Sequence, residues 1–213
     1  TNINNDVKQI VCGNHHTFIL KNDGSIWSCG ENDYGQLGLN DTNERNVFTE
    51  LYISSIDSDV KQIDCGSYHT FILYNDGTLM SCGRNNYGQL GLGNSDTNAH
   101  YTFTQATSGI KQITCGYYHN YIIKNNGTVW SCGYNSNGQL GIGTSGTNST
   151  ATTFTQVTTN INNDVKDIIC GCNFTYIIKN NGSIWSCGYN NAGELGLGTT
   201  GTSANKTTFT QVS

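Results

Sequence analysis

Proline is absent from this chain of 213 residues, so its 26 glycines must provide most of the turns between secondary-structure elements. Charged residues are scarce, at 12%, and Lys and Arg are scattered, which argues against a nucleic-acid partner. The apolar runs are only a few residues long, so we expect no membrane insertion. The chain has no initiating Met and no leader-like segment, and we therefore expect an excised or processed segment.

The chain consists instead of one unit repeated four times. The tetrapeptide GQLG (GELG in the last copy), the tripeptide SCG and a VKQI-like stretch recur together at intervals of about 50 residues. We interpret 1–213 as a single array with units at approximately 1–53, 54–106, 107–158 and 159–213. The residues that the tetrapeptide repeats are Gly35, Gln36, Gly38, Gly88, Gln89, Gly91, Gly138, Gln139, Gly141, Gly193, Glu194 and Gly196.

Each unit is expected to form four short antiparallel strands. In the first unit, VKQIVC and HTFILK are apolar stretches, and Asp23-Gly24 separates the second of them from SIWSCG. Asp-Gly or Asn-Gly recurs at this place in every unit and predicts a tight hairpin, because both turn residues must tolerate positive φ. An FTQ-like stretch supplies the fourth strand. Four strands in about 50 residues predict an all-β fold of four β-propeller blades.

The pattern VKQI-CG--HT-IL-NDG-IWSCG-N--GQLGLG resembles the repeat of the regulator of chromosome condensation family. The resemblance covers the whole chain and implies a β-propeller, usually of seven blades. The chain departs from the family in three ways. Cys29, Cys82, Cys132 and Cys187 stand where the family usually has Trp, the proline near the final strand is missing, and there are only four units. We therefore expect a partial propeller, or one completed by oligomerisation.

The resemblance implies several functions. The best-known eukaryotic member is a nucleotide exchange factor on chromatin, a role that this acidic chain without a basic tail does not favour. Other relatives are ubiquitin-ligase accessory domains, a secreted bacterial inhibitor of β-lactamase, and repeats of bacterial and phage surface proteins. The Asn- and Ile-rich, proline-free chain is most similar to the last group. This favours a bacterial surface or a virion, while the many cysteines leave a reducing cytoplasm open.

Eight of the nine cysteines form four pairs with the same spacing in every unit. The first and third strands of a meander lie roughly 9–10 Å apart, whereas bonded Cβ atoms need about 4 Å, so we expect no disulfide within a unit. We interpret the paired cysteines as small buried hydrophobes that precede glycines. The extra cysteine, Cys172, is expected to be exposed. Cys170 and Cys172 lack further ligands at zinc spacing, so no metal site and no cofactor are predicted.

Repeated polar residues are interpreted as structural. His16, His69 and His119 share one position of the repeat, which Phe174 takes in the last unit, and each is expected to hydrogen-bond within the fold. His15 and His100 are not repeated and are expected at the surface. The Gln and Asn residues of the glycine loops are expected to satisfy neighbouring backbone groups. These are Gln36, Gln89, Gln139 and Glu194, with Asn32, Asn85, Asn135 and Asn190.

Residues that differ between units are the candidates for ligand recognition. The segments after SCG read ENDY, RNNY, YNSN and YNNA. Tyrosines on rigid loops are good binding anchors, although they could equally cover blade edges. The candidate binding residues are Tyr34, Tyr87, Tyr134, Tyr189, Arg84 and Glu31. Longer loops at Asn40–Val47, Asn94–Tyr101, Thr144–Thr152 and Thr199–Thr207 are further candidates.

No grouping of catalytic residues repeats or breaks the repeat, so we expect no enzyme. The main hypothesis is a recognition module that binds a protein or a glycan at a bacterial or phage surface. One alternative is a structural component whose open ends drive self-association, since TNINNDVK occurs at both 1–8 and 159–166 and the Thr1/Ser213 seam could meet further repeats or a second copy. Another alternative is a specific protein inhibitor or a GTPase exchange-factor-like regulator.

Overall fold

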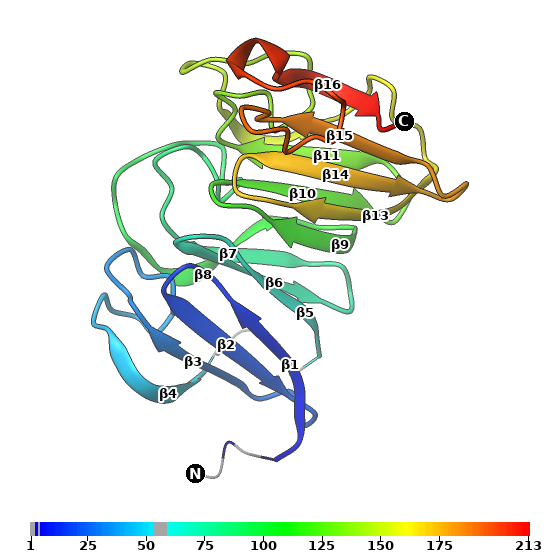
Figure 1. Ribbon diagram of the computed structural model, residues 1–213. Coiled ribbons are helices and arrows are strands. Elements are labelled where there is room, and N and C mark those ends of the chain that lie inside the picture. The colour runs from blue at the N-terminus through cyan, green and yellow to red at the C-terminus, as the bar shows by residue number, and fades with distance from the viewer. Residues whose placement is uncertain (1–2, 4, 53–58) are drawn as a thin grey trace.

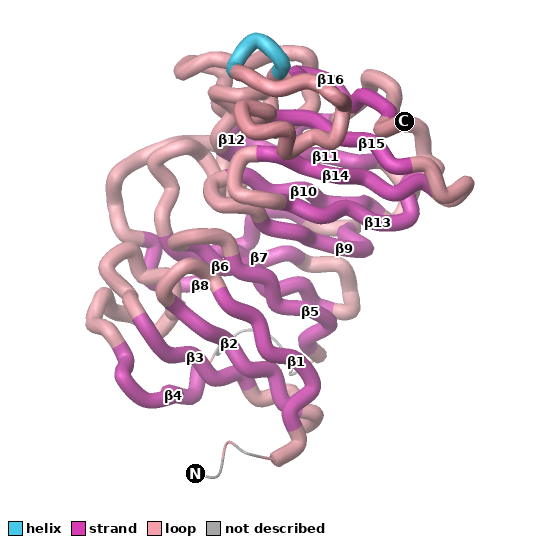
Figure 2. Tube along the Cα trace, in the orientation of Figure 1, coloured by secondary structure: helices cyan, strands magenta, loops and turns pink. Residues whose placement is uncertain are grey.

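The computed structural model describes residues 3, 5–52 and 59–213, which form four antiparallel sheets of four strands. Within every sheet the strands are hydrogen-bonded in chain order, so each repeat builds one blade. Figure 1 shows the four sheets following one another along the chain, and Figure 2 shows that turns and loops connect the strands, with one short helical turn before the last strand. The predicted fold class, four four-stranded blades of a β-propeller, is confirmed.

The strand bounds are similar in all four blades. Blade 1 contains β1 (Val7–Cys12), β2 (His16–Lys21), β3 (Ile26–Gly30) and β4 (Arg45–Leu51). Blade 2 contains β5 (Val60–Cys65), β6 (His69–Tyr74), β7 (Leu79–Gly83) and β8 (His100–Thr107). Blade 3 contains β9 (Ile110–Cys115), β10 (His119–Lys124), β11 (Val129–Gly133) and β12 (Ala151–Gln156). Blade 4 contains β13 (Val165–Cys170), β14 (Phe174–Lys179), β15 (Ile184–Gly188), the 3-10 turn η1 (Thr202–Ala204) and β16 (Lys206–Gln211).

The first strands of the blades, β1, β5, β9 and β13, contact one another in sequence and form the inner edge of the array. The turn after each first strand donates a backbone N–H to the same turn of the next blade. These bonds run from Asn14 to Ser67 (3.3 Å), from Ser67 to Tyr117 (3.1 Å) and from Tyr117 to Cys172 (3.3 Å). No helix within the described ranges is long and apolar enough to cross a membrane.

The predicted hairpins form between the second and third strands. In blade 1, the Lys21 N–H donates to the Ser25 carbonyl at 3.0 Å, and Gly24 has a φ of 85°. The Asp23 carboxylate accepts the Ser25 N–H at 2.9 Å, which closes the turn from the side chain. The Asp-Gly signal therefore identified the hairpin correctly.

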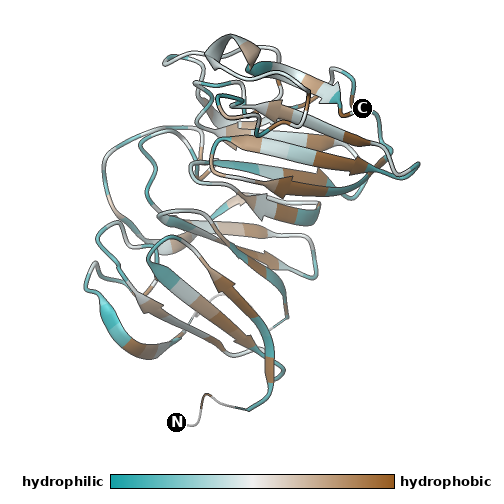
Figure 3. Ribbon diagram, viewed as in Figure 1, coloured by the Kyte–Doolittle hydropathy of each residue, from teal (hydrophilic) through white to brown (hydrophobic). Residues whose placement is uncertain are grey.

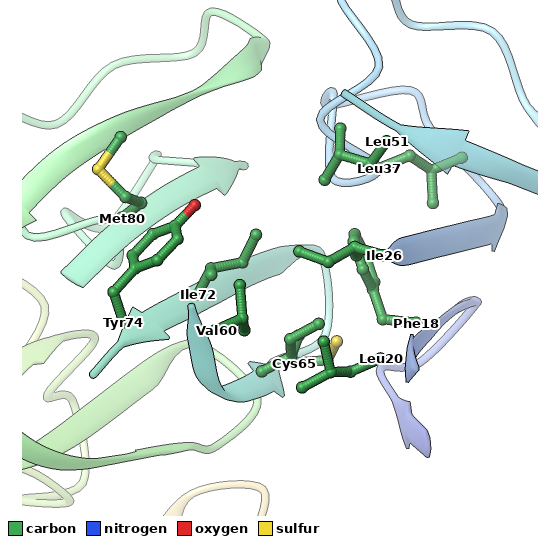
Figure 4. Packing of buried hydrophobic residues seen from close by; sticks show 11 residues of the cluster. Phe18, Leu20, Ile26, Leu37, Leu51, Val60, Cys65, Ile72, Tyr74 and Met80 are labelled. Atoms are coloured by element: carbon green, nitrogen blue, oxygen red, sulfur yellow. The ribbon is translucent and has the colours of Figure 1, made fainter. Parts of the chain in front are cut away.

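The hydrophobic core lies between successive blades. Figure 4 shows the cluster between blades 1 and 2, where Phe18 and Leu20 of β2 pack with Val60 and Cys65 of β5. Figure 3 shows that the apolar residues concentrate on the strands, whereas the loops are mainly polar. Each blade thus buries both of its faces where it has a neighbour on both sides, which explains why the strands do not alternate strictly.

The outer faces of the first and last blades expose side chains that are buried elsewhere. Ile10 is 60% exposed, whereas its counterparts in the other blades are almost fully buried. Those counterparts are Ile63 at 1%, Ile113 at 0% and Ile168 at 3%. At the other end, Ile184 is 43% exposed, while Leu79 and Val129 at the same repeat position are buried.

All nine cysteines are free thiols, and their burial differs from one to another. Cys65, Cys82, Cys132 and Cys187 are buried as expected, whereas Cys29, Cys115 and Cys170 are only half-buried. Cys12 is exposed, so the expectation of a buried thiol is wrong there, because no preceding blade covers the outer face of blade 1. Cys172 is exposed, as expected for the cysteine that interrupts the repeat.

Candidate functional site

The three repeated histidines lie at the interfaces between blades. Each ring nitrogen Nε2 hydrogen-bonds to a Thr or Asn on the second strand of the following blade. The pairs are His16–Thr70 at 3.0 Å, His69–Asn120 at 2.7 Å and His119–Thr175 at 2.9 Å. Thr70 donates its own hydrogen to the Gln36 carbonyl at 2.8 Å, so the hydroxyl oxygen accepts from His16 Nε2–H. The other two pairs are arranged in the same way, through Gln89 and Gln139.

These histidines are neutral in the folded protein. Burial lowers the pKa of His69 from 6.5 to about 4, and burial, with neighbouring histidines, lowers the pKa of His16 and of His119 to about 3. The glycine that follows each first strand leaves space for the histidine ring, since a Cβ on Gly66 would lie 2.0 Å from Cε1 of His69. The repeated histidines therefore hold the blades together and are not available to a ligand.

The repeated Gln and Asn residues build the loop between the third and fourth strands. In blade 1, the Gln36 side-chain carbonyl accepts the Tyr34 N–H at 3.0 Å, and the Asn32 side-chain carbonyl accepts the Leu37 N–H at 2.9 Å. Gly35 and Gly38 have φ values of 77° and 69°, which glycine adopts without strain. The same contacts recur in the other blades for Gln89, Gln139 and Glu194. The repeated residues thus form a rigid frame, and the residues that differ between blades project from it.

Six tyrosines on this frame form one continuous group, which we call the tyrosine strip. It consists of Tyr34, Tyr68, Tyr87, Tyr117, Tyr118 and Tyr134, all half-buried. The ring centroids lie 5.4 Å apart for Tyr34–Tyr68, 6.3 Å for Tyr68–Tyr118, 5.2 Å for Tyr87–Tyr118, 4.7 Å for Tyr87–Tyr134 and 4.6 Å for Tyr117–Tyr118. The strip crosses blades 1, 2 and 3, and each contact between neighbouring rings adds to their packing.

Arg84 lies at the centre of the tyrosine strip. Its guanidinium carbon lies 5.0 Å from the centroid of the Tyr34 ring, 5.8 Å from Tyr68, 5.8 Å from Tyr87 and 5.1 Å from Tyr118. The guanidinium donates to the Tyr118 hydroxyl at 3.0 Å and, through Nε, to the Asn86 side chain at 3.1 Å. A cation surrounded by aromatic rings is held in place by their negative faces. Arg84 is therefore preorganised rather than a free surface side chain.

The structure brings together four of the six candidate binding residues, namely Tyr34, Tyr87, Tyr134 and Arg84. Tyr189 has no ring contact with them among the described residues, and its backbone N–H donates to Asn173 at 2.9 Å. The backbone N–H of Glu31 donates to the His15 carbonyl at 2.9 Å, and no hydrogen bond or ion pair joins its side chain to the described part of the tyrosine strip. Tyr189 and Glu31 remain predicted binding residues on the basis of their position in the repeat alone.

The sequence-based prediction missed half of the tyrosine strip. Tyr68, Tyr117 and Tyr118 lie in the turns between first and second strands, not in the loops after SCG. A signal was present, because these positions also vary between blades: Tyr68 and Tyr118 correspond to His15 and Asn173. Looking for variable aromatic residues in both kinds of turn would have found them.

A shallow, open depression of about 300 Å³ lies beside the tyrosine strip at the inner edge of the blades. It is lined by the four turns that follow the first strands, including Ser67 and Tyr117. The Ser67 hydroxyl is buried, at 3% exposure, and has no hydrogen-bond partner in the described chain. Burial raises the pKa of the Cys65 and Cys115 thiols well above the usual value, so both stay protonated. No group of three His, Cys, Asp or Glu residues within the described ranges could hold a metal ion.

The fold and the repeated frame define an array of β-propeller blades. The family model "Regulator of chromosome condensation (RCC1) repeat" matches residues 23–73, 76–123 and 126–178, and a second model of the same description matches 7–36, 60–89 and 110–139. The chain therefore belongs to the regulator of chromosome condensation repeat family.

Relatives in other proteins match only part of the chain. The human X-linked retinitis pigmentosa GTPase regulator is 40% identical over 88 residues, which is 41% of this chain and 9% of that protein. The Bos taurus secretion-regulating guanine nucleotide exchange factor is 40% identical over 86 residues, or 40% of this chain and 18% of that protein. The chain thus spans less than a fifth of the length of these curated relatives.

Two solved structures share the fold over the whole chain. Human WBSCR16 has a TM-score of 0.82 at 23% identity, with 54% of that chain covered. Yeast RCC1 (Prp20), in a structure with Kap60, has a TM-score of 0.83 at 21% identity, with 50% of that chain covered. At this level of identity, the likeness shows the propeller fold alone.

Proposed function

We propose that this chain is a non-enzymatic protein-binding module of a regulator and that its partner docks on the tyrosine strip. The observation that carries the proposal is Arg84 held among four tyrosine rings on a face built from loops. Tyr and Arg are the residues that most often dominate the binding energy of protein interfaces. Rigid tyrosines lose little conformational entropy when a partner covers them. The variation of these residues between blades supports the same conclusion, since the fold itself requires only the repeated ones.

A small GTPase is the partner class that the relatives favour. One is named a GTPase regulator and another a guanine nucleotide exchange factor. This supports the alternative of an exchange-factor-like regulator over the hypothesis of a bacterial or phage surface protein. The two curated relatives named here are animal proteins and lend no support to carbohydrate binding, self-association or a virion location.

The test measures both binding and release of a fluorescent guanine nucleotide across a panel of small GTPases, with and without this protein. We expect at least one GTPase to bind and Tyr87→Ala to weaken that binding by about tenfold or more, as for a hot-spot residue. The matched control is Tyr189→Ala, which removes a tyrosine that lies outside the strip and should leave affinity unchanged. If no GTPase binds, the proposed partner class is wrong. If Tyr87→Ala binds like the wild type, the proposed docking surface is wrong.

A further inference from the structure

Arg84 and Tyr118 together retain hydrogen-bond donors that the described residues do not use. A guanidinium carries five N–H donors, and the recorded bonds of Arg84 go only to Asn86 and Tyr118. Because the Tyr118 hydroxyl accepts from Arg84, its own hydrogen is available to another acceptor. No acceptor for that hydrogen, or for the remaining guanidinium hydrogens, is present in the described part of the chain. Neither Arg84 nor Tyr118 is among the buried side chains that lack a partner in the described chain, so these donors face solvent and can reach an acceptor from outside.

Both groups present hydrogen-bond donors to a ligand. A guanidinium carries N–H donors and no acceptor. Burial raises the pKa of Tyr118 to about 12, against the opposing effect of the neighbouring Arg84, so the phenol stays protonated. The rings of Tyr34, Tyr68 and Tyr87 lie 5.0 to 5.8 Å from the guanidinium carbon, and the Arg84 side chain is half-buried among them. A hydrogen bond to a charged group is stronger in such a setting than on an open surface.

We infer that Arg84 and Tyr118 form a receptor for one carboxylate, from an Asp or Glu side chain in an exposed loop of the partner protein. The planar guanidinium matches the two oxygens of a carboxylate, and the phenol hydrogen adds a further donor. This inference rests on the proposed function and names the chemistry that the partner must present. The bond pattern involves no covalent step and no cofactor.

A single carboxylate fits this face better than a phosphate group. Glu31 and Asp33 lie in the blade 1 loop whose Tyr34 contacts Arg84. Two negative charges in that neighbouring loop disfavour a dianionic ligand more than a monoanionic one. The site also occurs once, because the repeat position of Arg84 is Glu31 in blade 1 and Tyr134 and Tyr189 in blades 3 and 4. Because the tyrosine strip holds a single cation, Arg84, we expect it to bind a single acidic side chain rather than a group with two negative charges.

The experiment titrates the isotope-labelled protein with two short peptides and follows the Nε–H signal of Arg84 by NMR. The probes are acetyl-Trp-Asp-Trp-amide and its neutral counterpart acetyl-Trp-Asn-Trp-amide. We expect the acidic peptide to produce a saturable shift and to bind at least about tenfold more tightly than the neutral one, as for a charge-assisted hydrogen bond. Inorganic phosphate in the same titration should bind more weakly than the acidic peptide.

Two variants distinguish the hydrogen-bonding geometry of the guanidinium from its positive charge alone. Arg84→Lys keeps the charge but loses the planar fork, and Tyr118→Phe loses the hydroxyl while keeping the ring. Each should weaken the acidic peptide by about fivefold or more and leave the neutral peptide unchanged. The matched control is Arg45→Lys, because the Arg45 guanidinium is already paired with Asp41 at 2.6 Å. It should bind both peptides like the wild type.

Equal affinity for the two peptides, or a preference for phosphate, would overturn the inference. So would a lack of response at Arg84 up to saturating acidic peptide, with the folded state confirmed by the dispersed spectrum. The failure of the proposed function looks different. In that case the acidic peptide binds through Arg84, but no protein partner depends on Tyr87. Conversely, if a partner requires Tyr87 for binding and yet binds the Arg84→Lys variant as tightly as the wild type, that result supports the proposed function and overturns the carboxylate receptor.

Discussion

Lowering the pH from 7 to 5 should destabilise the folded chain through its three buried histidines. His16, His69 and His119 have folded pKa values of about 3 to 4, compared with 6.5 for the free side chain. Because these pKa values are lowered on folding, the histidines favour the folded state above pH 6.5, and this preference is lost as the pH falls towards 4. Each histidine should cost about 2 kcal/mol between pH 7 and 5, or about 6 kcal/mol for the three.

Asp64 works in the opposite direction. Burial raises the pKa of its carboxyl from 3.8 to about 7, against two backbone N–H donors that lower it. Since this pKa is raised on folding, the protonated carboxyl stabilises the folded state at low pH, and the effect is lost as the pH rises through 7. Asp64 should therefore recover about 2 kcal/mol at pH 5 relative to pH 7. The net loss of unfolding free energy is then roughly 3–4 kcal/mol.

The assay is urea unfolding at pH 7 and pH 5, followed by the fluorescence of Trp27, Trp130 and Trp185. The test variant is His119→Phe, for which Phe174 in blade 4 is a natural template, because its ring packs on Gly171 as the histidine rings pack on their glycines. Its partner Thr175 keeps its bond to the Gln139 carbonyl at 3.2 Å. The difference in unfolding free energy between the two pH values should shrink by about 2 kcal/mol.

Asp64→Asn provides the opposite control and should enlarge the difference between the two pH values by about 2 kcal/mol. If His119→Phe leaves that difference unchanged, the reasoning from neutral buried histidines is refuted. If the difference in unfolding free energy between pH 7 and pH 5 is larger in His119→Phe than in the wild type, both the predicted direction and the predicted size of the histidine effect are wrong.

Two further predictions concern the thiols and the glycines. A thiol reagent applied to the folded protein should modify Cys12 and Cys172 first, because both are exposed. Mass spectrometry of the digested protein identifies the modified residues, and earlier modification of the buried thiols would contradict the prediction. Gly66→Ala should destabilise the chain by about 3 kcal/mol in the same urea assay, because the new Cβ would overlap the His69 ring. Gly198→Ala, where the Cβ would meet nothing within 4 Å, should cost only about 1 kcal/mol from its positive φ, and equal losses would contradict the steric argument.

Much of the fold was predictable because it depends on local signals. The hairpin at Asp23-Gly24 follows from two residues that tolerate positive φ. Because the sequence repeats, a correct strand prediction for one unit is correct for the other three as well. The structural role of His69 was inferred from its repetition, but its partner Asn120 lies in the next blade. A spacing in the sequence contains no information about which atom lies across an interface between blades.

The candidate site was predictable only in part, for the same reason. Tyr34 and Tyr87 were singled out because their loops vary between units, whereas Tyr68 and Tyr118 lie in a different turn and were missed. The two kinds of turn converge only when the blades pack side by side. The exposure of Cys12 has the same origin, since it depends on whether another blade covers that face.

The sequence by itself determined the repeat, the four strands of each blade and the glycine frame of the loops, because these depend on short-range periodicity and on backbone conformations that few residues adopt. Only the tertiary structure decided that Arg84 sits among tyrosines from three blades and hydrogen-bonds to Tyr118. Those residues are 34 positions apart in the chain, and packing between blades, which no local pattern specifies, brings them together.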